Sequence, residues 1–256
     1  MAIYAYCLLR LPAEEDWPVM QGIDGHPVFP LRCGKYTMLM SRLDRNYRFT
    51  PRSIVQHGQI IGRAFETHTV LPMRFGTSFQ SEKQVVQLIQ ENRSELLEAF
   101  CRLRGRAEMH LKLLLPPDVQ NPGSPKKSLP NSRAAGKRRP NGNGAGKLAD
   151  APMDARSRML AEQLAVWARE MFRPLEQQVR CRMILGSELL VDCAHLIENK
   201  RVASYQKLRR SAAEQLKGCD LRISGPWPPY HFLPTSIRLP AATPPVLRAR
   251  AAVAAR

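Results

Sequence analysis

The sequence has no apolar run long enough to cross a bilayer, no CxxC pair and no common catalytic fingerprint. It contains no GxSxG, P-loop, GxGxxG or HExxH pattern. Aromatic residues make up only 7% of the chain. These absences argue against an integral membrane protein and against the common hydrolase, nucleotide-binding and zinc-protease classes. We expect a protein that is not an enzyme, with no catalytic residue, metal or cofactor.

Acidic residues are also scarce, with 22 against 39 lysines and arginines, which gives a net charge of +17. Residues 121–150 carry +6 and residues 233–256 carry +4 of this charge, so the remainder of the chain carries +7. Both basic segments are rich in Pro, Gly, Ser or Ala and have no aromatic residue between the charges. Such segments attract any polyanion, so they are weak evidence for a specific nucleic-acid partner.

The six cysteines include no CxxC pair and have no nearby histidine at zinc-finger spacing, so they do not indicate a metal site. Because most of them have aliphatic neighbours, we expect reduced cysteines in the core. Cys193 and His195 fall on the same face of a predicted strand and could form a nucleophile and base. A core cysteine beside a hydrogen-bonded histidine is the favoured interpretation, since Asp192 points to the opposite face and cannot orient the ring.

The length of 256 residues and the pattern of the chain favour an α+β protein of two domains. Residues 1–104 are predicted to form a ferredoxin-like N-terminal domain, with helices on one face of a sheet. Residues 105–232 are predicted to form a smaller α+β domain that contains a flexible basic insertion at 118–151. Residues 233–256 are predicted to be a disordered tail. The first residues lack a basic segment and a cleavage site, so we expect no secretory signal and a cytoplasmic location.

Residues 1–104 alternate between strand and helix patterns. Strands are predicted at 3–9, which is apolar on both faces as in a central strand, at 28–32 and 36–43, which form a hairpin, and at 70–75. Helices are predicted at 51–66 and 81–103. Their apolar repeats are Ile54, Gly58, Ile61 and Phe65 in the first, and Val85, Ile89, Leu96, Phe100 and Leu103 in the second. In the first strand one face is expected to carry Ile3, Ala5, Cys7 and Leu9, and the other Tyr4, Tyr6 and Leu8. Thr50 and Pro51 predict a helix start, and Ser81 with Gln84 predicts a capping box. Pro72 indicates an edge strand or a bulge.

The same periodicities continue after residue 104. Strands are predicted at 107–115, 189–197 and 219–224, and the polar face of the first of them carries Glu108, His110 and Lys112. One helix is predicted from Leu160 to Val179 with a kink at Pro174. A second is predicted from an Asn199 cap to Gly218. The last strand is expected to stop at Gly225, because prolines cannot donate to a sheet ladder, and an aromatic lid is expected to follow.

Two stretches stand out as signatures. The first includes Leu71, Pro72, Arg74, Phe75, Gly76 and Thr77, and the second is Gly225, Pro226, Trp227, Pro228, Pro229 and Tyr230. In this order they resemble the hallmarks of the gas vesicle protein F/L family, over roughly residues 1–115 and 153–232. A GxaYL-like motif that the family usually carries before the next helix is not found. The resemblance implies a modified ferredoxin-like N-terminal domain and a smaller α+β C-terminal domain.

The resemblance also implies a function. It implies a gas vesicle accessory protein that binds the small hydrophobic shell protein and other accessory proteins, and that assists vesicle assembly or forms a minor part of the vesicle. No membrane and no specific nucleic acid would be a partner, and the oligomeric state stays open. The alternative is a basic nucleic-acid-binding protein that acts through its Lys- and Arg-rich segments.

Four signature residues are candidates for partner contact. Arg74 could bind a partner carboxylate, although an ion pair within the protein is the more common outcome. Phe75 lies beside it on the same predicted strand. Trp227 and Tyr230 could anchor a partner, although such aromatic residues more often complete their own core.

Overall fold

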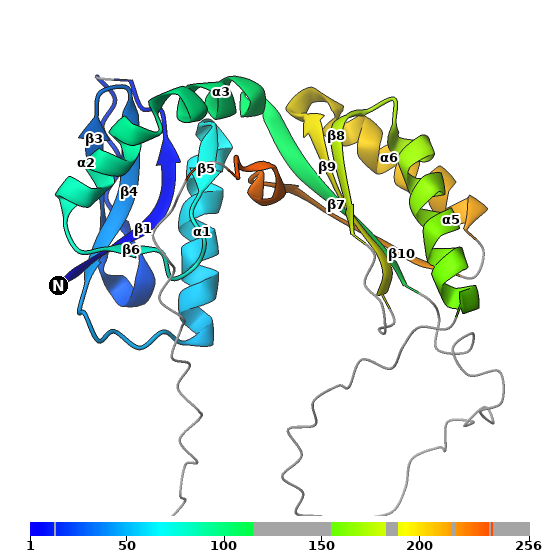
Figure 1. Ribbon diagram of the computed structural model, residues 1–256, viewed down its shortest axis with the longest axis horizontal. Coiled ribbons are helices and arrows are strands. Elements are labelled where there is room, and N and C mark those ends of the chain that lie inside the picture. Colours follow the sequence, from blue (N-terminus) through cyan, green and yellow to red (C-terminus); the bar gives the residue numbers. More distant parts are fainter. Residues whose placement is uncertain (13, 115–154, 183–188, 217–218, 236, 238–256) are drawn as a thin grey trace, which may run out of the picture. The chain divides into compact units, whose positions relative to one another are not determined.

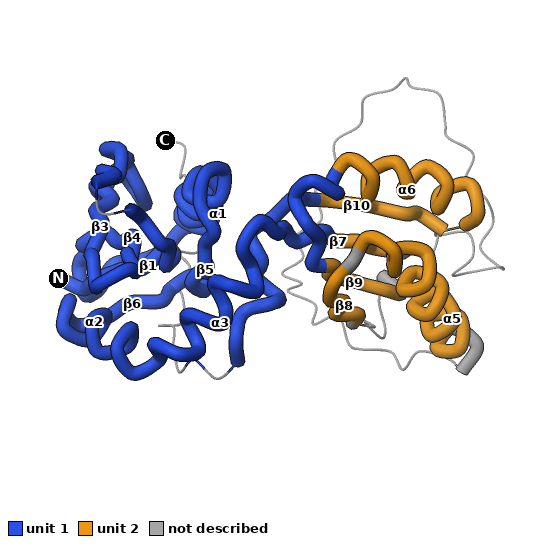
Figure 2. Tube along the Cα trace, turned by 90° about the horizontal axis from the view of Figure 1, so that it is seen from above, with its two compact units in different colours: residues 1–109, 196–202, 225–256 blue, residues 110–195, 203–224 orange. Residues whose placement is uncertain are grey.

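The computed structural model describes residues 1–12, 14–114, 155–182, 189–216, 219–235 and 237 (Figure 1). It divides into two compact units (Figure 2). Unit 1 contains residues 1–109, 196–202 and 225 onward, and unit 2 contains residues 110–195 and 203–224. The predicted insertion at 118–151, Gly218 and nearly all of the predicted tail lie outside the described residues. The domain boundary at 104/105 remains a proposal.

Unit 1 is built on an antiparallel sheet with the order β2-β3-β4-β1-β5. Its strands are β1 (Ala2–Leu9), β2 (Met20–Gln21), β3 (Pro27–Cys33), β4 (Tyr36–Leu43), β5 (Val70–Pro72) and β6 (Ser78–Phe79), which also pairs with β1. A 3-10 turn, η1 (Ile23–Gly25), follows β2. The predicted central strand and the predicted hairpin of β3 and β4 are confirmed. β5 ends the sheet order, as Pro72 indicated, but it stops at Pro72 and does not reach Phe75.

The predicted faces of β1 are wrong because this strand carries a bulge. Its register against β4 shifts between Ala5 and Cys7. A bulge places an extra residue on one strand and so interrupts the alternation of side chains. One core cluster therefore contains Tyr4 and Tyr6 together with Cys7 and Leu9, which the simple alternation had separated.

Helices cover both faces of this sheet, rather than the one face that we predicted. Helix α1 (Pro51–Thr67) packs on the core cluster that also contains Leu39 and Leu43 of β4. On the opposite face of β4, Tyr36 stacks with Phe100 of α3, with 5.4 Å between ring centroids. Side chains of a strand alternate between faces, so Leu39 and Leu43 point into the layer of α1 and Tyr36 points into the layer of α3.

The cap that was predicted for α1 is present. Thr50 and Ser53 form a reciprocal capping box, and Pro51 occupies the first turn. The buried side of the helix is rotated relative to the apolar repeat in the sequence. It consists of Ser53, His57, Ile60, Ile61 and Ala64, whereas Ile54 is 47% exposed.

The single helix predicted at 81–103 is two helices, α2 (Glu82–Glu91) and α3 (Arg93–Leu103). They meet at Asn92, whose side-chain amide donates to the Leu88 carbonyl and ends α2. The predicted capping box is also wrong, because the Gln84 side chain accepts from the backbone N–H of Gln80. The apolar stripe is nevertheless buried as predicted: Val85, Ile89, Leu96, Phe100 and Leu103.

The second sheet has the order β10-β7-β9-β8. Its strands are β7 (Arg106–Leu114), β8 (Glu176–Arg182), β9 (Leu189–Glu198) and β10 (Asp220–Trp227). Three of these strands, β7, β9 and β10, contain the points at which the chain passes between units 1 and 2.

Among its described residues, unit 2 contains the helix α5 (Ala155–Phe172) and, apart from its first residue, the helix α6 (Val202–Gln215). The predicted helix through Val179 is wrong: α5 stops before Pro174, and Val179 belongs to β8. Proline lacks the N–H that the next helical turn needs, and here it ends the helix instead of kinking it. A buried aromatic group of Phe172, His195 and Tyr205 joins α5, β9 and α6.

Asn199 does not cap α6 directly. It begins a 3-10 turn, η2 (Asn199–Arg201), which precedes the helix. The described chain ends beyond a third such turn, η3 (Tyr230–Phe232). No helix in the described ranges is both long enough and apolar enough to cross a membrane.

Candidate partner-binding site

The first signature forms an edge strand that turns sharply back toward β1. After β5, the backbone N–H of Met73 donates to the Tyr6 carbonyl, at 2.8 Å. The N–H of Thr77 donates to the Arg74 carbonyl and closes a turn, in which Gly76 has a φ of 89°. A positive φ is readily adopted only by glycine, so this position explains the glycine of the signature.

Tyr4 and His57 hold this turn from inside the core. The Met73 carbonyl accepts from His57 Nε2 at 3.1 Å, which leaves Nδ1 to accept from the Tyr4 hydroxyl at 2.8 Å. The Tyr4 hydroxyl oxygen in turn accepts from the N–H of Gly76. Burial lowers the pKa of His57 to about 4, and the hydrogen bond to Met73 opposes this shift. The imidazole is therefore neutral at pH 7 and has one donor and one acceptor, as the two contacts require.

The two candidate contact residues in this turn, Arg74 and Phe75, differ in their exposure to solvent. Arg74 is exposed, and the ion pairs of the described residues do not include it. Phe75 is half-buried, with its ring 5.0 Å from that of Phe49 and 5.6 Å from that of His57. Arg74 is thus available for contact, whereas Phe75 is largely part of the aromatic core.

The second signature does not stop the last strand as predicted. β10 runs through Gly225 and Pro226 to Trp227. A Cβ on Gly225, which has a φ of 122°, would lie 2.8 Å from the Glu108 carbonyl oxygen, so only glycine lets the backbone come this close to β7. β10 is at the end of the sheet order, so the missing N–H of Pro226 does not interrupt a central ladder.

Beyond β10, buried and exposed residues are mixed. Pro228, Pro229 and Phe232 are buried, and Phe232 is only 1% exposed. Trp227 is 48% exposed and Tyr230 is 39% exposed. Phe232 is therefore the anchor of the predicted aromatic lid, and the two residues that we chose as partner contacts remain accessible to solvent.

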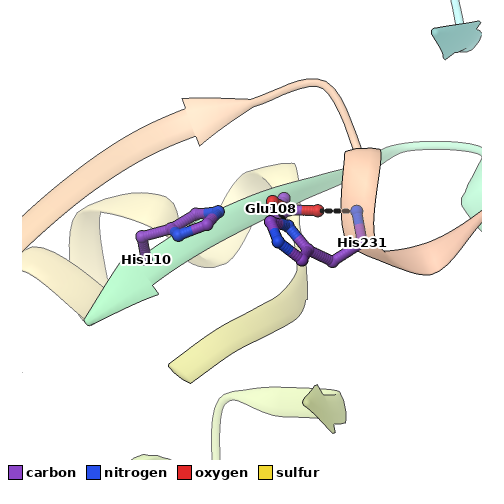
Figure 3. A group of neighbouring side chains, drawn as sticks. All are labelled: Glu108, His110 and His231. Atoms are coloured by element: carbon purple, nitrogen blue, oxygen red, sulfur yellow. Dashed lines mark hydrogen bonds and ion pairs between the residues drawn. The ribbon is translucent and has the colours of Figure 1, made fainter. Parts of the chain in front are cut away.

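A buried carboxylate holds this segment and was missed from the sequence. Glu108 was expected on the polar face of its strand, but it is 0% exposed. Figure 3 shows its carboxylate beside His231: it accepts from the His231 backbone N–H at 2.8 Å and contacts Nδ1 of the ring at 2.7 Å. Strict alternation of polar and apolar residues gives no sign that one polar residue is buried.

Both signatures lie in unit 1, although they are about 150 residues apart in the sequence. Burial raises the pKa of Tyr230 to about 12, and Cys7 and Glu108 contribute to the shift. Burial also raises the pKa of Tyr4, with a small contribution from Tyr230. Tyr230 of the second signature therefore affects the pKa of Tyr4, the residue that hydrogen-bonds to the turn of the first signature.

Cys193 and His195 are a core cysteine and a hydrogen-bonded histidine, as the favoured interpretation predicted. Both residues are buried, and His195 Nδ1 lies 2.5 Å from the Tyr205 hydroxyl. Burial and the nearby His110 lower the pKa of His195 to about 3. The Cys193 thiol donates to another cysteine, Cys181.

The fold and this site define a two-unit α+β protein in which both signature segments contribute to one aromatic-rich unit. Comparison with known proteins gives the family. The sequence profile described as "Gas vesicle synthesis protein GvpL/GvpF" matches residues 2–234. The chain belongs to this family, and its membership supports a gas vesicle accessory role.

Individual relatives agree with the family. The chain is 30% identical over 115 residues to gas vesicle protein F of Nostoc sp., a match that covers 43% of this chain and 47% of the relative. It is 29% identical over 117 residues to the protein of the same name from Microcystis aeruginosa, covering 44% and 48%. These two matches span about half the length of the curated relatives. A match to gas vesicle protein F of Streptomyces sp. is 26% identical and covers 91% of this chain and 100% of the relative.

Solved structures show the fold over nearly the whole chain. The crystal structure of gas vesicle protein GvpF from Anabaena sp. has a TM-score of 0.70 at 18% identity, covering 92% of this chain and 99% of that one. The GvpF structure from Microcystis aeruginosa has a TM-score of 0.69 at 19% identity, covering 91% and 99%. The predicted α+β class is therefore confirmed.

Proposed function

We propose that this protein is a non-enzymatic, gas-vesicle-associated adaptor that assists vesicle assembly by binding the small hydrophobic shell protein and other accessory proteins. The family match over residues 2–234 carries this proposal. A shell subunit that exposes apolar surface before it polymerises is prone to aggregate. An adaptor that covers this surface would keep the subunit available for assembly.

We place the contact surface at the exposed parts of the two signatures. Arg74 offers a cation outside the ion pairs of the described chain, and Trp227 and Tyr230 offer large amphipathic surfaces. Aromatic and arginine side chains are the residue types that most often dominate binding energy at interfaces. Phe75 contributes by fixing the turn that carries Arg74.

Co-purification of the tagged full chain with the shell protein, at low and at high salt, tests the proposal. We expect the shell protein to stay bound in high salt and after deletion of residues 121–150. If only nucleic acid is recovered, and either salt or this deletion removes it, the adaptor function is wrong and the basic segments are responsible.

Paired variants test the contact surface separately. Arg74→Glu and Trp227→Ala should each weaken shell-protein binding at least about tenfold, as expected for the loss of a dominant contact. Arg45→Glu and Val55→Ala change an exposed cation and an exposed aliphatic residue elsewhere in unit 1 and should bind as the wild type does. Equal binding by all four variants would leave the adaptor function standing and refute the site.

A further inference from the structure

Two cysteine thiols are in contact in unit 2. Cys181 lies on β8 and Cys193 lies on β9, and these strands are neighbours in the second sheet. The Cys193 thiol donates to the Cys181 sulfur across 3.0 Å. A disulfide bond is about 2.05 Å long, so the two sulfurs need to approach by only about 1 Å to be linked.

The two thiols differ in access to solvent. Cys181 is half-buried, whereas Cys193 is buried on β9. A small oxidant from solvent can therefore reach Cys181 first. The sulfur that would complete the bond is already in place behind it.

The environment of Cys181 also favours its thiolate. The hydrogen bond from Cys193 and the nearby Arg169 guanidinium lower the pKa of Cys181 to about 7, although burial and Asp192 oppose the shift. At neutral pH about half of such thiols are ionised, compared with a few per cent of ordinary ones. Burial instead raises the pKa of Cys7 and of Cys219.

We propose that Cys181 and Cys193 form a redox site in which a hydroperoxide converts the two thiols to an inter-strand disulfide. The Cys181 thiolate attacks one peroxide oxygen, which breaks the O–O bond and leaves a sulfenic acid and hydroxide. The Cys193 sulfur then attacks the sulfenic sulfur and displaces its hydroxyl group, while the thiol proton completes a water molecule. Two thiols and one hydrogen peroxide give one disulfide and two waters, and a dithiol reductant reverses the reaction.

The disulfide would act on the neighbouring strands β8 and β9. It would link these strands covalently, whereas the reduced thiols are in contact through a weak sulfur hydrogen bond. The site is independent of the contact surface proposed for the shell protein. Its test therefore does not depend on the adaptor function.

Peptide mass spectrometry on the full chain tests this site. The native protein is treated with stoichiometric hydrogen peroxide at pH 7, alkylated and cleaved after glutamate. Cleavage at Glu176, Glu188 and Glu198 places the two cysteines on separate peptides, residues 177–188 and 189–198. We expect these peptides to be linked after oxidation and separated again by dithiothreitol.

Matched variants assign the roles of the two sulfurs. Cys193→Ser should accumulate a sulfenic acid on Cys181 that dimedone traps, and Cys181→Ser should give no linked peptide. Cys219→Ser, a change at a half-buried cysteine with a raised pKa, should form the disulfide as the wild type does. In the wild type, iodoacetamide at pH 7 should modify Cys181 roughly tenfold faster than a thiol of ordinary pKa.

Two results would overturn the proposal. One is the absence of linked peptides under conditions that oxidise the exposed Cys101. The other is the formation of the linked peptides at the same rate in urea-unfolded protein as in native protein, since the pairing would then owe nothing to the fold.

Discussion

At the scale of single residues, the least expected feature of unit 1 is a histidine that must stay neutral. His57 accepts from Tyr4 and donates to the Met73 carbonyl, and it sits among the rings of Tyr6 and Phe75. Protonation would add a second donor where Tyr4 now donates, and would place a charge in an apolar layer. The neutral ring is thus part of the structure that fixes the first signature.

We predict that unit 1 loses stability as the pH falls from about 6.5 towards 4. The folded pKa of His57, about 4, lies below the unfolded value of 6.5, so the unfolded state binds the proton first and the free energy of unfolding decreases. Between pH 7 and pH 5 the loss from this residue is about 2 kcal/mol. Urea unfolding of wild type and His57→Phe at the two pH values measures it.

His57→Phe keeps a ring in the core but leaves the Met73 carbonyl without its donor, so it should be less stable at pH 7 by about 2 kcal/mol. Its stability should also change less between pH 7 and pH 5. His26→Ala, at a half-buried histidine of the same unit, serves as the control and should keep the pH dependence of the wild type. An unchanged pH dependence in His57→Phe would show that the buried ring is not the source.

Sequence patterns do not predict the burial of single polar residues. His57, Glu108 and Ser53 are all buried because each has specific hydrogen-bond partners, and those partners are distant in the sequence or lie in the helix cap. A hydrophobic repeat treats such residues as solvent-facing. The exposed Arg74 and Trp227 were identified from their signatures, whereas the role of Phe232 as the anchor was not.

At the scale of elements, most strands and helices were predictable because their local signals agree with the fold. The Thr50-Pro51 start of α1, the hairpin of β3 and β4, and the edge position of β5 all follow from local stereochemistry. The errors occur where a side chain or a bulge changes the outcome: Asn92 divides one predicted helix, and the bulge near Tyr6 reverses the faces of β1. Neither effect leaves a periodic signal.

The substitutions Gly225→Ala and Gly58→Ala should change the stability of the protein in opposite directions. In Gly225→Ala the new methyl group would meet the Glu108 carbonyl and Met109 at a φ of 122°, so we expect a loss of at least about 2 kcal/mol. Gly58 lies in α1, with open space where its Cβ would be. There alanine should stabilise the helix by up to about 1 kcal/mol.

Urea unfolding monitored by tryptophan fluorescence and circular dichroism measures both changes. If Gly225→Ala is as stable as the wild type, the close approach of β10 to β7 is not tight enough to require glycine. A destabilised Gly58→Ala would mean that the outer side of α1 is less open than the structure shows.

At the scale of the whole molecule, the chain leaves unit 1 after Met109 and finally returns to it at Gly225. This course explains how two stretches about 150 residues apart in the sequence can contribute to the same unit. Sequence analysis found the two stretches and their order. It assigned them to different domains, because contacts between distant segments leave no local pattern.

Two truncations test whether the segment after residue 224 stabilises unit 1. Ending the chain at residue 224 removes Phe232 and takes both His231 contacts from the buried Glu108 carboxylate. Loss of the buried Phe232 ring costs about 3 kcal/mol, and loss of two hydrogen bonds to a buried carboxylate costs roughly 3 kcal/mol more. We expect unit 1 of this variant to unfold at a much lower urea concentration, or not to fold at all.

Ending the chain at residue 237 is the matched control, because it keeps both Phe232 and His231. We expect its stability to be within about 0.5 kcal/mol of the full chain, which is the range of a change that removes no packed contact. Phe232→Ala provides a milder change that should still fold and should lose about 3 kcal/mol. If Phe232→Ala and the chain ending at 224 both unfold at the same urea concentration as the full chain, the second signature does not contribute to the core of unit 1, and its residues would have to be explained by partner binding alone.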